Sequence, residues 1–184
     1  MSLLSYNELC ELVEQNVINA PISQVNGSSI DITLDDIIRL EDQPKFNAII
    51  DLRAKENIET YEHILTEYGY QMAPGEFLLA SSREVFTLPG NISCEYKLKS
   101  SLARNGMEHL NAGWCDSFWS NSKLTLELKN MTRFHRLTLK PGMGIGQMVF
   151  FRHEPVPHEH GYAVKGQYNH QSRTTASKGV RIAS

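Results

Sequence analysis

The sequence predicts a mainly β fold, a sandwich or barrel with a few peripheral helices. From about Phe77 onward the chain consists of short alternating or apolar runs, separated by turn signals such as Pro89-Gly90 and Pro141-Gly142. Its 184 residues, 41% hydrophobic and 21% charged, match the size and composition of one ordinary globular domain, here residues 1–184. We therefore expect many short strands that pack around one core.

Charge and cysteine usage argue against several classes of protein. The formal charge of −3 gives no indication of a nucleic-acid or membrane surface. No apolar run approaches the roughly 20 residues that cross a bilayer, and the N-terminus lacks the features of a signal peptide. The three cysteines form no C-x-x-C pair, which argues against a disulfide framework and a structural zinc site. We expect a cytoplasmic protein without nucleic-acid or membrane partners.

Two helices are predicted before the β-rich part of the chain. Ser5 and Glu8 have the spacing of a capping box, and apolar residues follow at helical intervals until Pro21 prevents continuation. A second helical pattern covers residues 58–68, with Tyr61 and Ile64 on its apolar face.

Five segments after the predicted helices have the pattern of strands, and a polar tail follows them. The predicted strands are residues 77–80, 95–99, 124–128, 137–139 and 148–151. The last thirty residues are rich in His, Gln, Ser and Thr. We interpret them as a surface arm that becomes ordered only against a partner or ligand.

The segment 124–129 places one carboxylate within an otherwise apolar strand. Period-2 alternation puts three leucines on one face and Thr125, Glu127 and Lys129 on the other. A half-exposed strand with a polar outer face also fits this pattern. Upstream, Ser100-Ser101 and Arg104 supply hydroxyls and a guanidinium, which suit phosphate oxygens, although an ordinary turn with a solvated arginine fits them as well.

Three motifs together resemble one family. They are Ser-Ser-Leu-Ala-Arg at 100–104, Ala-Gly-Trp-x-Asp at 112–116 and Thr-Leu-Glu-Leu-x-Asn at 125–130. In this order they resemble the dCTP deaminase branch of the dUTPase-like trimeric family. The resemblance covers most of residues 28–177 and is weakest between residues 40 and 70. It implies a β-clip fold, a dUTPase-like distorted β-barrel or sandwich.

The resemblance also implies a catalytic set. Glu127 occupies the position of the general base, which takes a proton from the water that attacks C4 of cytosine and then protonates the departing amine. Ser100 and Arg104 occupy positions that support this water and the tetrahedral centre. The implied reaction converts dCTP and water to dUTP and ammonia.

Substrate-binding positions follow from the same resemblance. Lys99 and Ser101 would contact phosphates, the Ala112 carbonyl would orient the water or base edge, and Asp116 would contact the deoxyribose 3′-hydroxyl. The C-terminal arm, approximately residues 160–184, would close over the triphosphate, and its implied contacts are Tyr162, Gln167 and Gln171. Mg²⁺ would be bound through the phosphates. Family sites lie between subunits, so a homotrimer is implied.

A zinc-independent route is also indicated by the residues themselves. Zinc-dependent nucleobase deaminases carry H-x-E and C-x-x-C motifs, and this sequence has neither. A route without zinc needs a carboxylate within reach of the attacking water, and Glu127 is the well-placed candidate.

Several positions depart from the family pattern and leave other functions open. Lys99 replaces a usual arginine, Gln167 replaces a common basic residue, and the loop at residues 117–123 lacks the expected Pro-Gly and final Gly. One alternative is a bifunctional deaminase and dUTPase, or a dUTPase that releases pyrophosphate, in which Asp116 would activate the water. A nucleotide-binding sensor with the same fold and no turnover is the non-enzymatic alternative.

Overall fold

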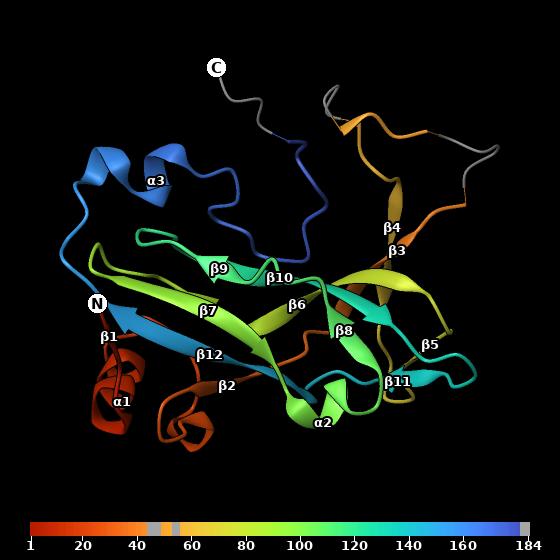
Figure 1. Ribbon diagram of the computed structural model, residues 1–184, viewed down its shortest axis with the longest axis horizontal. Helices are drawn as coiled ribbons and strands as arrows, with labels where there is room; N and C mark the ends of the chain where they lie inside the picture. The colour runs from red at the N-terminus through yellow and green to blue at the C-terminus, as the bar shows by residue number, and fades with distance from the viewer. Residues whose placement is uncertain (44–48, 53–55, 181–184) are drawn as a thin grey trace.

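The computed structural model describes residues 1–43, 49–52 and 56–180, and within them the fold is mainly β, as predicted (Figure 1). All pairings between named strands are antiparallel. One five-stranded sheet has the order β1-β12-β7-β9, with β2 also paired to β12, and the second has the order β4-β3-β6-β10-β8. A small sheet pairs β11 with β5.

The strands are grouped by sheet, and their numbers follow the order along the chain. The strands of the first sheet are β1 (Ser2–Leu3), β2 (Ile30–Thr33), β7 (Ile92–Leu98), β9 (Trp114–Cys115) and β12 (Gly144–Arg152). Those of the second are β3 (Ile37–Glu41), β4 (Thr60–Ile64), β6 (Phe77–Phe86), β8 (Met107–His109) and β10 (Ser122–Asn130). The small sheet contains β5 (Tyr70–Met72) and β11 (Leu137–Leu139). The helices are α1 (Tyr6–Glu14), α2 (Ser100–Ala103) and α3 (Tyr162–Lys165), with 3-10 turns η1 (Ile22–Gln24) and η3 (His158–His160).

The first predicted helix is confirmed as α1. The backbone N–H of Ser5 donates to Glu8 Oε2 at 2.9 Å, as a capping box requires. The helix ends at Glu14, before Pro21, because Asn16 adopts a left-handed backbone with φ of 55°. No helix in the described part of the chain is long and apolar enough to cross a membrane.

The second predicted helix is wrong, because the described part of residues 58–68 contains the strand β4 instead. This strand pairs with β3 in the register Ile37↔Ile64. Of the apolar residues that suggested a helix, Leu65 is buried, whereas Tyr61 and Ile64 are 49% and 68% exposed. Backbone pairing with β3 satisfies the N–H and C=O groups that a helix would have satisfied internally.

The predicted strands are present, and most extend beyond the predicted bounds. The pattern at 77–80 belongs to β6, and that at 124–128 belongs to β10, which pairs with β6 in the register Glu127↔Leu79. A prediction from apolar runs stops where polar residues begin, whereas the strands continue because their polar residues also pair.

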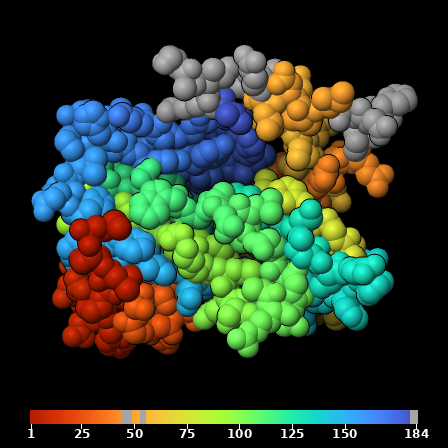
Figure 2. Space-filling view, viewed as in Figure 1, coloured from red at the N-terminus to blue at the C-terminus, as the bar shows by residue number. Residues whose placement is uncertain are grey.

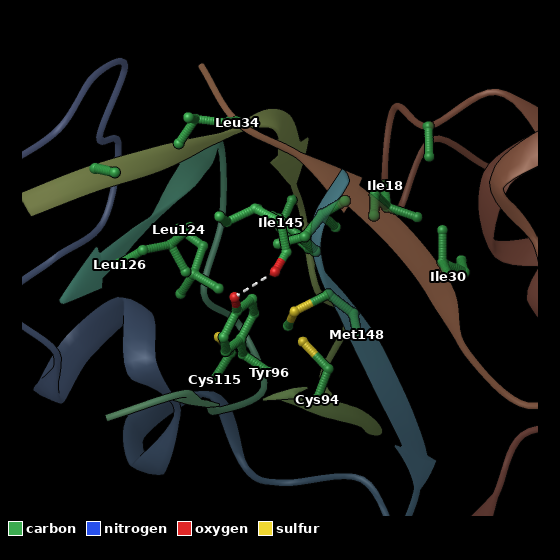
Figure 3. Packing of buried hydrophobic residues seen from close by; sticks show 14 of the residues in the cluster. Ile18, Ile30, Leu34, Cys94, Tyr96, Cys115, Leu124, Leu126, Ile145 and Met148 are labelled. Carbon is green, nitrogen blue, oxygen red and sulfur yellow. Dashed lines mark hydrogen bonds between the residues drawn. The ribbon is translucent and has the colours of Figure 1, made fainter. Parts of the chain in front are cut away.

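The core lies between the two large sheets. Leu126, Ile145, Met148 and Phe150 are fully buried there. Figure 3 shows Tyr96 among these side chains, with its hydroxyl donating to the Ile145 carbonyl oxygen at 3.0 Å. Tyr96 therefore buries a ring without leaving its hydroxyl unpaired.

The interpretation of the C-terminal segment as an arm without order of its own is wrong for residues 160–180. Gln171 and Thr174 are buried, and the Lys123 N–H donates to the Gln171 carbonyl at 2.8 Å. Thr174 Oγ1 donates to the Ile37 carbonyl at 2.8 Å. Figure 2 shows the segment in blue, packed against the rest of the chain. Backbone groups of the segment are thus satisfied within one protomer.

Candidate active site

Strand β10 presents Glu127 on the face opposite the core. Leu124, Leu126 and Leu128 are buried, whereas Thr125 and Glu127 are only half-buried, which confirms the predicted alternation. The strand is held on one side by β6 and, near its end, on the other side by β8. The carboxylate therefore projects from a strand that is paired on both sides.

A pocket of about 470 Å³ lies over this polar face. Its floor contains Thr125 and Glu127 from β10 and Phe77 and Leu79 from β6. Most of its lining is apolar, and Glu127 is the one charged side chain among the described residues that line it. A carboxylate in such surroundings interacts strongly with any polar group that enters.

The pocket walls come from three separate parts of the chain. Ala112 and Trp114 contribute from the segment around β9, and Ile58 contributes from the residues before β4. The C-terminal side is formed by Tyr162, Tyr168, Gln171 and residues 175–177. Of the residues predicted for the site, the structure thus brings together Glu127, Ala112, Tyr162 and Gln171.

His109 lies beside Glu127. Its Nε2 atom is 3.2 Å from Glu127 Oε2, and the imidazole is almost fully buried. The distance is within hydrogen-bonding range, but neither atom has a hydrogen-bond partner among the described residues, since the two are not aligned. A carboxylate and an imidazole therefore face each other at the edge of the pocket.

Tyr96 packs against the His109 ring of this His109–Glu127 pair. Its ring lies 4.5 Å from the His109 ring, centroid to centroid. Burial, with a smaller contribution from the negative charge of Glu127, raises the pKa of the Tyr96 phenol. Tyr96 therefore stays a neutral hydroxyl at neutral pH.

The C-terminal segment is fastened by the loop at residues 116–121. Trp119 Nε1 donates to the Tyr168 carbonyl at 2.8 Å, and the Ser120 N–H donates to Asn169 Oδ1 at 2.8 Å. The Tyr162 N–H in turn donates to the Ser117 carbonyl at 3.0 Å. The loop that departs from the family pattern is thus the attachment site of the segment.

Close packing of Phe118 explains part of the loop's shape. Phe118 has a left-handed backbone with φ of 64°, which is strained for a bulky residue. Its ring lies against Gly90 and Gly161, where an added Cβ would approach it to 2.5 Å and 2.3 Å respectively. Glycine at both positions permits the ring to bridge two distant segments.

Gln171 and Gln167 are positioned differently. Gln171 lines the pocket, but its amide nitrogen donates to the Tyr168 carbonyl at 2.8 Å, so this end of the side chain already has a partner. Gln167 is half-buried and outside the pocket lining, and its carbonyl accepts a hydrogen bond from Lys178 Nζ at 2.6 Å.

The predicted phosphate and water ligands lie elsewhere on the protomer. Ser100, Ser101 and Arg104 are exposed on or next to α2, and none of them lines the pocket. Lys99 also lies outside it and forms an ion pair with Asp31 at 2.6 Å. One protomer therefore does not bring the two halves of the predicted site together.

Asp116 is exposed beside the pocket, and its carboxylate accepts a hydrogen bond from the Trp114 indole. Trp114 Nε1 donates to Asp116 Oδ1 at 2.8 Å. The indole is itself half exposed and lies near Phe151, with ring centroids 6.1 Å apart. Trp114 can therefore fix the direction of the carboxylate that was predicted to contact a sugar hydroxyl.

Sequence reasoning missed His109, Tyr168 and Thr125 as parts of the site. His109 is distant from Glu127 in sequence, and only the pairing of β8 with β10, in the register Leu128↔His109, makes them neighbours. The alternation in Met107-Glu108-His109, with the outer two buried, was the available signal. Among the described residues, no group of three or more His, Cys, Asp or Glu side chains is arranged to hold a metal ion.

Comparison with known proteins identifies relatives along most of the chain. The family model described as dCTP deaminase-like matches residues 3–153. A protein of Pseudarthrobacter chlorophenolicus named "dCTP deaminase, dUMP-forming" is 35% identical over 145 residues, which cover 77% of this chain and 75% of that protein. A protein of the same name from Beutenbergia cavernae is 34% identical over 159 residues, 85% of this chain and 82% of that protein.

A solved structure shares the fold. The 2′-deoxycytidine 5′-triphosphate deaminase from Agrobacterium tumefaciens matches with a TM-score of 0.61 and 20% sequence identity. The match covers 80% of this chain and 47% of that one, so this chain spans about half the length of that protein. At this identity the likeness concerns the fold.

Proposed function

This chain belongs to the dCTP deaminase-like family, and from that premise we propose that it deaminates dCTP by hydrolysis with Glu127 as general base. The observation that carries this proposal is the position of Glu127, the one charged side chain among the described residues lining an apolar pocket of about 470 Å³. A pocket of this size suits a small-molecule ligand.

The reaction consumes water and releases ammonia. Glu127 takes a proton from water while the water oxygen bonds to C4 of cytosine, which gives a tetrahedral centre. Glu127 then gives the proton to the amino nitrogen, the C4–N bond breaks, and dUTP and ammonia result. General acid–base catalysis of this kind contributes about 10²- to 10⁴-fold to a rate.

The second half of the site is proposed to come from another copy of the chain. A triphosphate needs cationic partners, yet no described residue that lines the pocket is cationic. Ser100, Ser101 and Arg104 are exposed and lie outside the lining of this pocket, and they supply hydroxyls and a guanidinium. In a homotrimer, the α2 region of one protomer would complete the pocket of its neighbour.

The proposed roles around the substrate follow this division. Ser100 and Arg104 support the attacking water and the tetrahedral centre, and Ser101 and Lys99 contact phosphates. From the pocket side, the Ala112 carbonyl orients the base and Asp116 accepts a hydrogen bond from the deoxyribose 3′-hydroxyl. Tyr162, Gln167 and Gln171 close the C-terminal side. Tyr162 and Gln171 line the pocket, which supports their two proposed roles, whereas Gln167 lies outside the lining.

Magnesium is proposed to enter with the nucleotide. The oxygen ligands it prefers would be the phosphates, with water completing its shell. The ion would offset phosphate charge, and Glu127 would act on the water at C4.

A second activity is favoured by the names of the relatives. Both quoted relatives are named as dUMP-forming, which requires loss of diphosphate in addition to ammonia. A bifunctional enzyme would cleave the α–β phosphate bond with a second water, for which Asp116 is the proposed base. Its carboxylate is exposed beside the pocket and is oriented by Trp114.

One assay separates these activities. The protein is incubated with dCTP, dUTP, CTP and dCMP in the presence of Mg²⁺, and ammonia and diphosphate are measured separately. Ammonia without diphosphate from dCTP supports a deaminase that stops at dUTP, and equal amounts of both support dUMP formation. Diphosphate from dUTP alone supports a dUTPase. Nucleotide binding without either product supports the non-enzymatic sensor and contradicts the proposal.

The variant Glu127→Gln tests the general base in the same assay. It keeps the size of the side chain but cannot accept the proton, so ammonia release should fall by at least about 100-fold while nucleotide binding persists. Isothermal titration with dCTP provides the binding measurement. Undiminished turnover in this variant would contradict the role of Glu127.

A further inference from the structure

The strongest signal that the predicted roles do not explain is the pair of buried polar atoms His109 Nε2 and Glu127 Oε2. Each is inaccessible to solvent and has no hydrogen-bond partner among the described residues, although the two atoms are 3.2 Å apart. A buried polar atom without a partner destabilises the folded state, so two that face each other need an explanation.

The exposure of the two side chains is unequal. The side chain of His109 is 5% exposed and is absent from the pocket lining, whereas that of Glu127 is 27% exposed and lines the pocket. Because Oε2 is buried, the exposure of Glu127 lies on its other atoms. One carboxylate oxygen is thus turned to the imidazole and the rest of the side chain is open to a ligand.

The imidazole is held from behind by a tightly packed tyrosine. The Tyr96 ring contacts the His109 ring with a centroid distance of 4.5 Å, and its hydroxyl is tied to the Ile145 carbonyl (Figure 3). An added Cβ at Gly146 would lie 2.1 Å from the Tyr96 ring, and one at Gly113 would lie 2.7 Å from Tyr96 Cβ. Tyr96 therefore has no room to withdraw, and His109 keeps its place against β10.

We propose that His109 is a positioning residue for the Glu127 carboxylate. Its Nε2–H donates to Oε2 and fixes the rotation of the carboxylate, so that the other oxygen is presented to the water that attacks the substrate. This inference rests on the proposed role of Glu127 as general base. His109 itself touches neither the substrate nor the reacting water.

The poor alignment of His109 Nε2 with Glu127 Oε2 agrees with the role of His109 as a positioning residue. Hydrogen bonds of catalytic groups are often poorly aligned in ligand-free proteins and become aligned when substrate binds. A small rotation of the Glu127 side chain suffices, since the distance is already in range. Substrate that contacts the open oxygen would bring about this rotation, and the hydrogen bond to His109 would then hold it.

The first test compares two replacements of His109 in the dCTP assay. His109→Leu fills the space without a donor, whereas His109→Gln keeps an N–H donor near the position of Nε2. We expect kcat for ammonia release to fall by about 10- to 100-fold in His109→Leu with KM nearly unchanged, because a misplaced base slows the chemistry and the pocket lining is intact. His109→Gln should recover most of the loss. Thermal unfolding curves of both variants serve as the control for correct folding.

Two outcomes of this test would overturn the proposal. Equal losses in His109→Leu and His109→Gln, at matched thermal stability, would mean that the imidazole only fills space. An unchanged kcat in His109→Leu would mean that Glu127 needs no support from this side.

A second readout does not depend on turnover. Long-range ¹H–¹⁵N spectra of histidine-labelled protein show which ring nitrogen of His109 carries the proton. We expect protonated Nε2, with a resonance that moves in Glu127→Gln and does not move in the exposed-site variant Glu67→Gln. An unprotonated Nε2, or one that ignores Glu127→Gln, contradicts the inference. If the wild-type protein releases no ammonia, the proposed function fails, and this spectrum alone decides whether the positioning contact exists.

Discussion

The polar face of β10 and the short helix α2 carry the two parts of the predicted site, and the structure surrounds them very differently. Glu127 on β10 is enclosed by paired strands, by His109 and by the C-terminal segment. Ser100, Ser101 and Arg104 at α2 are exposed. In Figure 1 the C-terminal segment lies along the upper side of β9 and β10, whereas α2 lies at the lower edge of the molecule.

This difference indicates how the two parts work. A general base needs fixed geometry, and one protomer encloses the proposed base Glu127 by itself. The proposed function assigns phosphate binding to the exposed donors at α2, which would reach the pocket of a neighbouring protomer. The following tests address this contrast, beginning with the largest expected effect.

Complementation between two inactive variants tests whether the site is shared between protomers. Glu127→Gln and Arg104→Ala should each lower ammonia release by about 100-fold or more. When the two chains are co-expressed, random trimers should regain about a quarter of wild-type activity, because a quarter of neighbouring pairs then carry an intact residue on each side. Purification with two different tags isolates the mixed trimers, in which one neighbouring pair of three carries both intact residues, so their activity should be about a third of wild type.

A control excludes simple mixing effects. The double variant, with both changes on one chain, should restore nothing when co-expressed with Glu127→Gln. Failure of the two single variants to complement each other would show that one protomer supplies both residues. It would contradict the inference that β10 and α2 of different protomers form one site.

Substitutions in the loop that holds the C-terminal segment should lower the free energy of unfolding more than a substitution next to α2. Trp119 is buried, stacks on Phe86 with ring centroids 5.3 Å apart and donates to the Tyr168 carbonyl. Trp119→Ala should lower the free energy of unfolding by about 3–5 kcal/mol. Arg104→Ala, at an exposed position, should change it by less than about 0.5 kcal/mol. Denaturant unfolding measures both.

Trp119→Phe is the matched control for the hydrogen bond. It keeps a ring beside Phe86 but removes the donor to Tyr168, so proteolysis of the C-terminal segment should accelerate while the loss of global stability is smaller than in Trp119→Ala. Identical behaviour of the two variants would show that the indole N–H does not hold the segment.

The smallest expected effect concerns Tyr96 at alkaline pH. Burial raises the pKa of this phenol above its value of about 10 in an unfolded chain. The folded state therefore favours the neutral form, and the corresponding stability is present below pH 10 and is lost as the pH rises above it. Tyr96→Phe should be less stable at neutral pH by about 1–3 kcal/mol, because the Ile145 carbonyl loses its donor. Its stability should decline less steeply above pH 10.

Denaturant unfolding at a series of pH values measures this difference, and Tyr68→Phe provides the control at a position that is 79% exposed. If the free energy of unfolding declines in parallel with pH in the wild-type protein and in Tyr96→Phe, Tyr96 does not contribute to alkaline unfolding. Tyr96 would then pack less tightly against His109 than the structure indicates.

Local sequence patterns were sufficient to predict features that depend on neighbouring residues. The capping box of α1 and the alternation along β10 depend on residues a few positions apart, and both predictions are confirmed. The family resemblance is confirmed by the match over residues 3–153. The roles of Ser100, Arg104 and the other site residues stay predictions, to be tested by the experiments above.

The contacts between segments that are distant in the sequence became known from the folded structure. Residues 60–64 look helical by their apolar spacing, but pairing with β3 makes them a strand. The C-terminal segment looks like a free arm by composition, but the loop around Trp119 binds it within the protomer. His109 carries no local signal of function and gains one from the register of β8 on β10. Strand pairing and burial depend on partners far away in the sequence, and a local pattern contains no information about them.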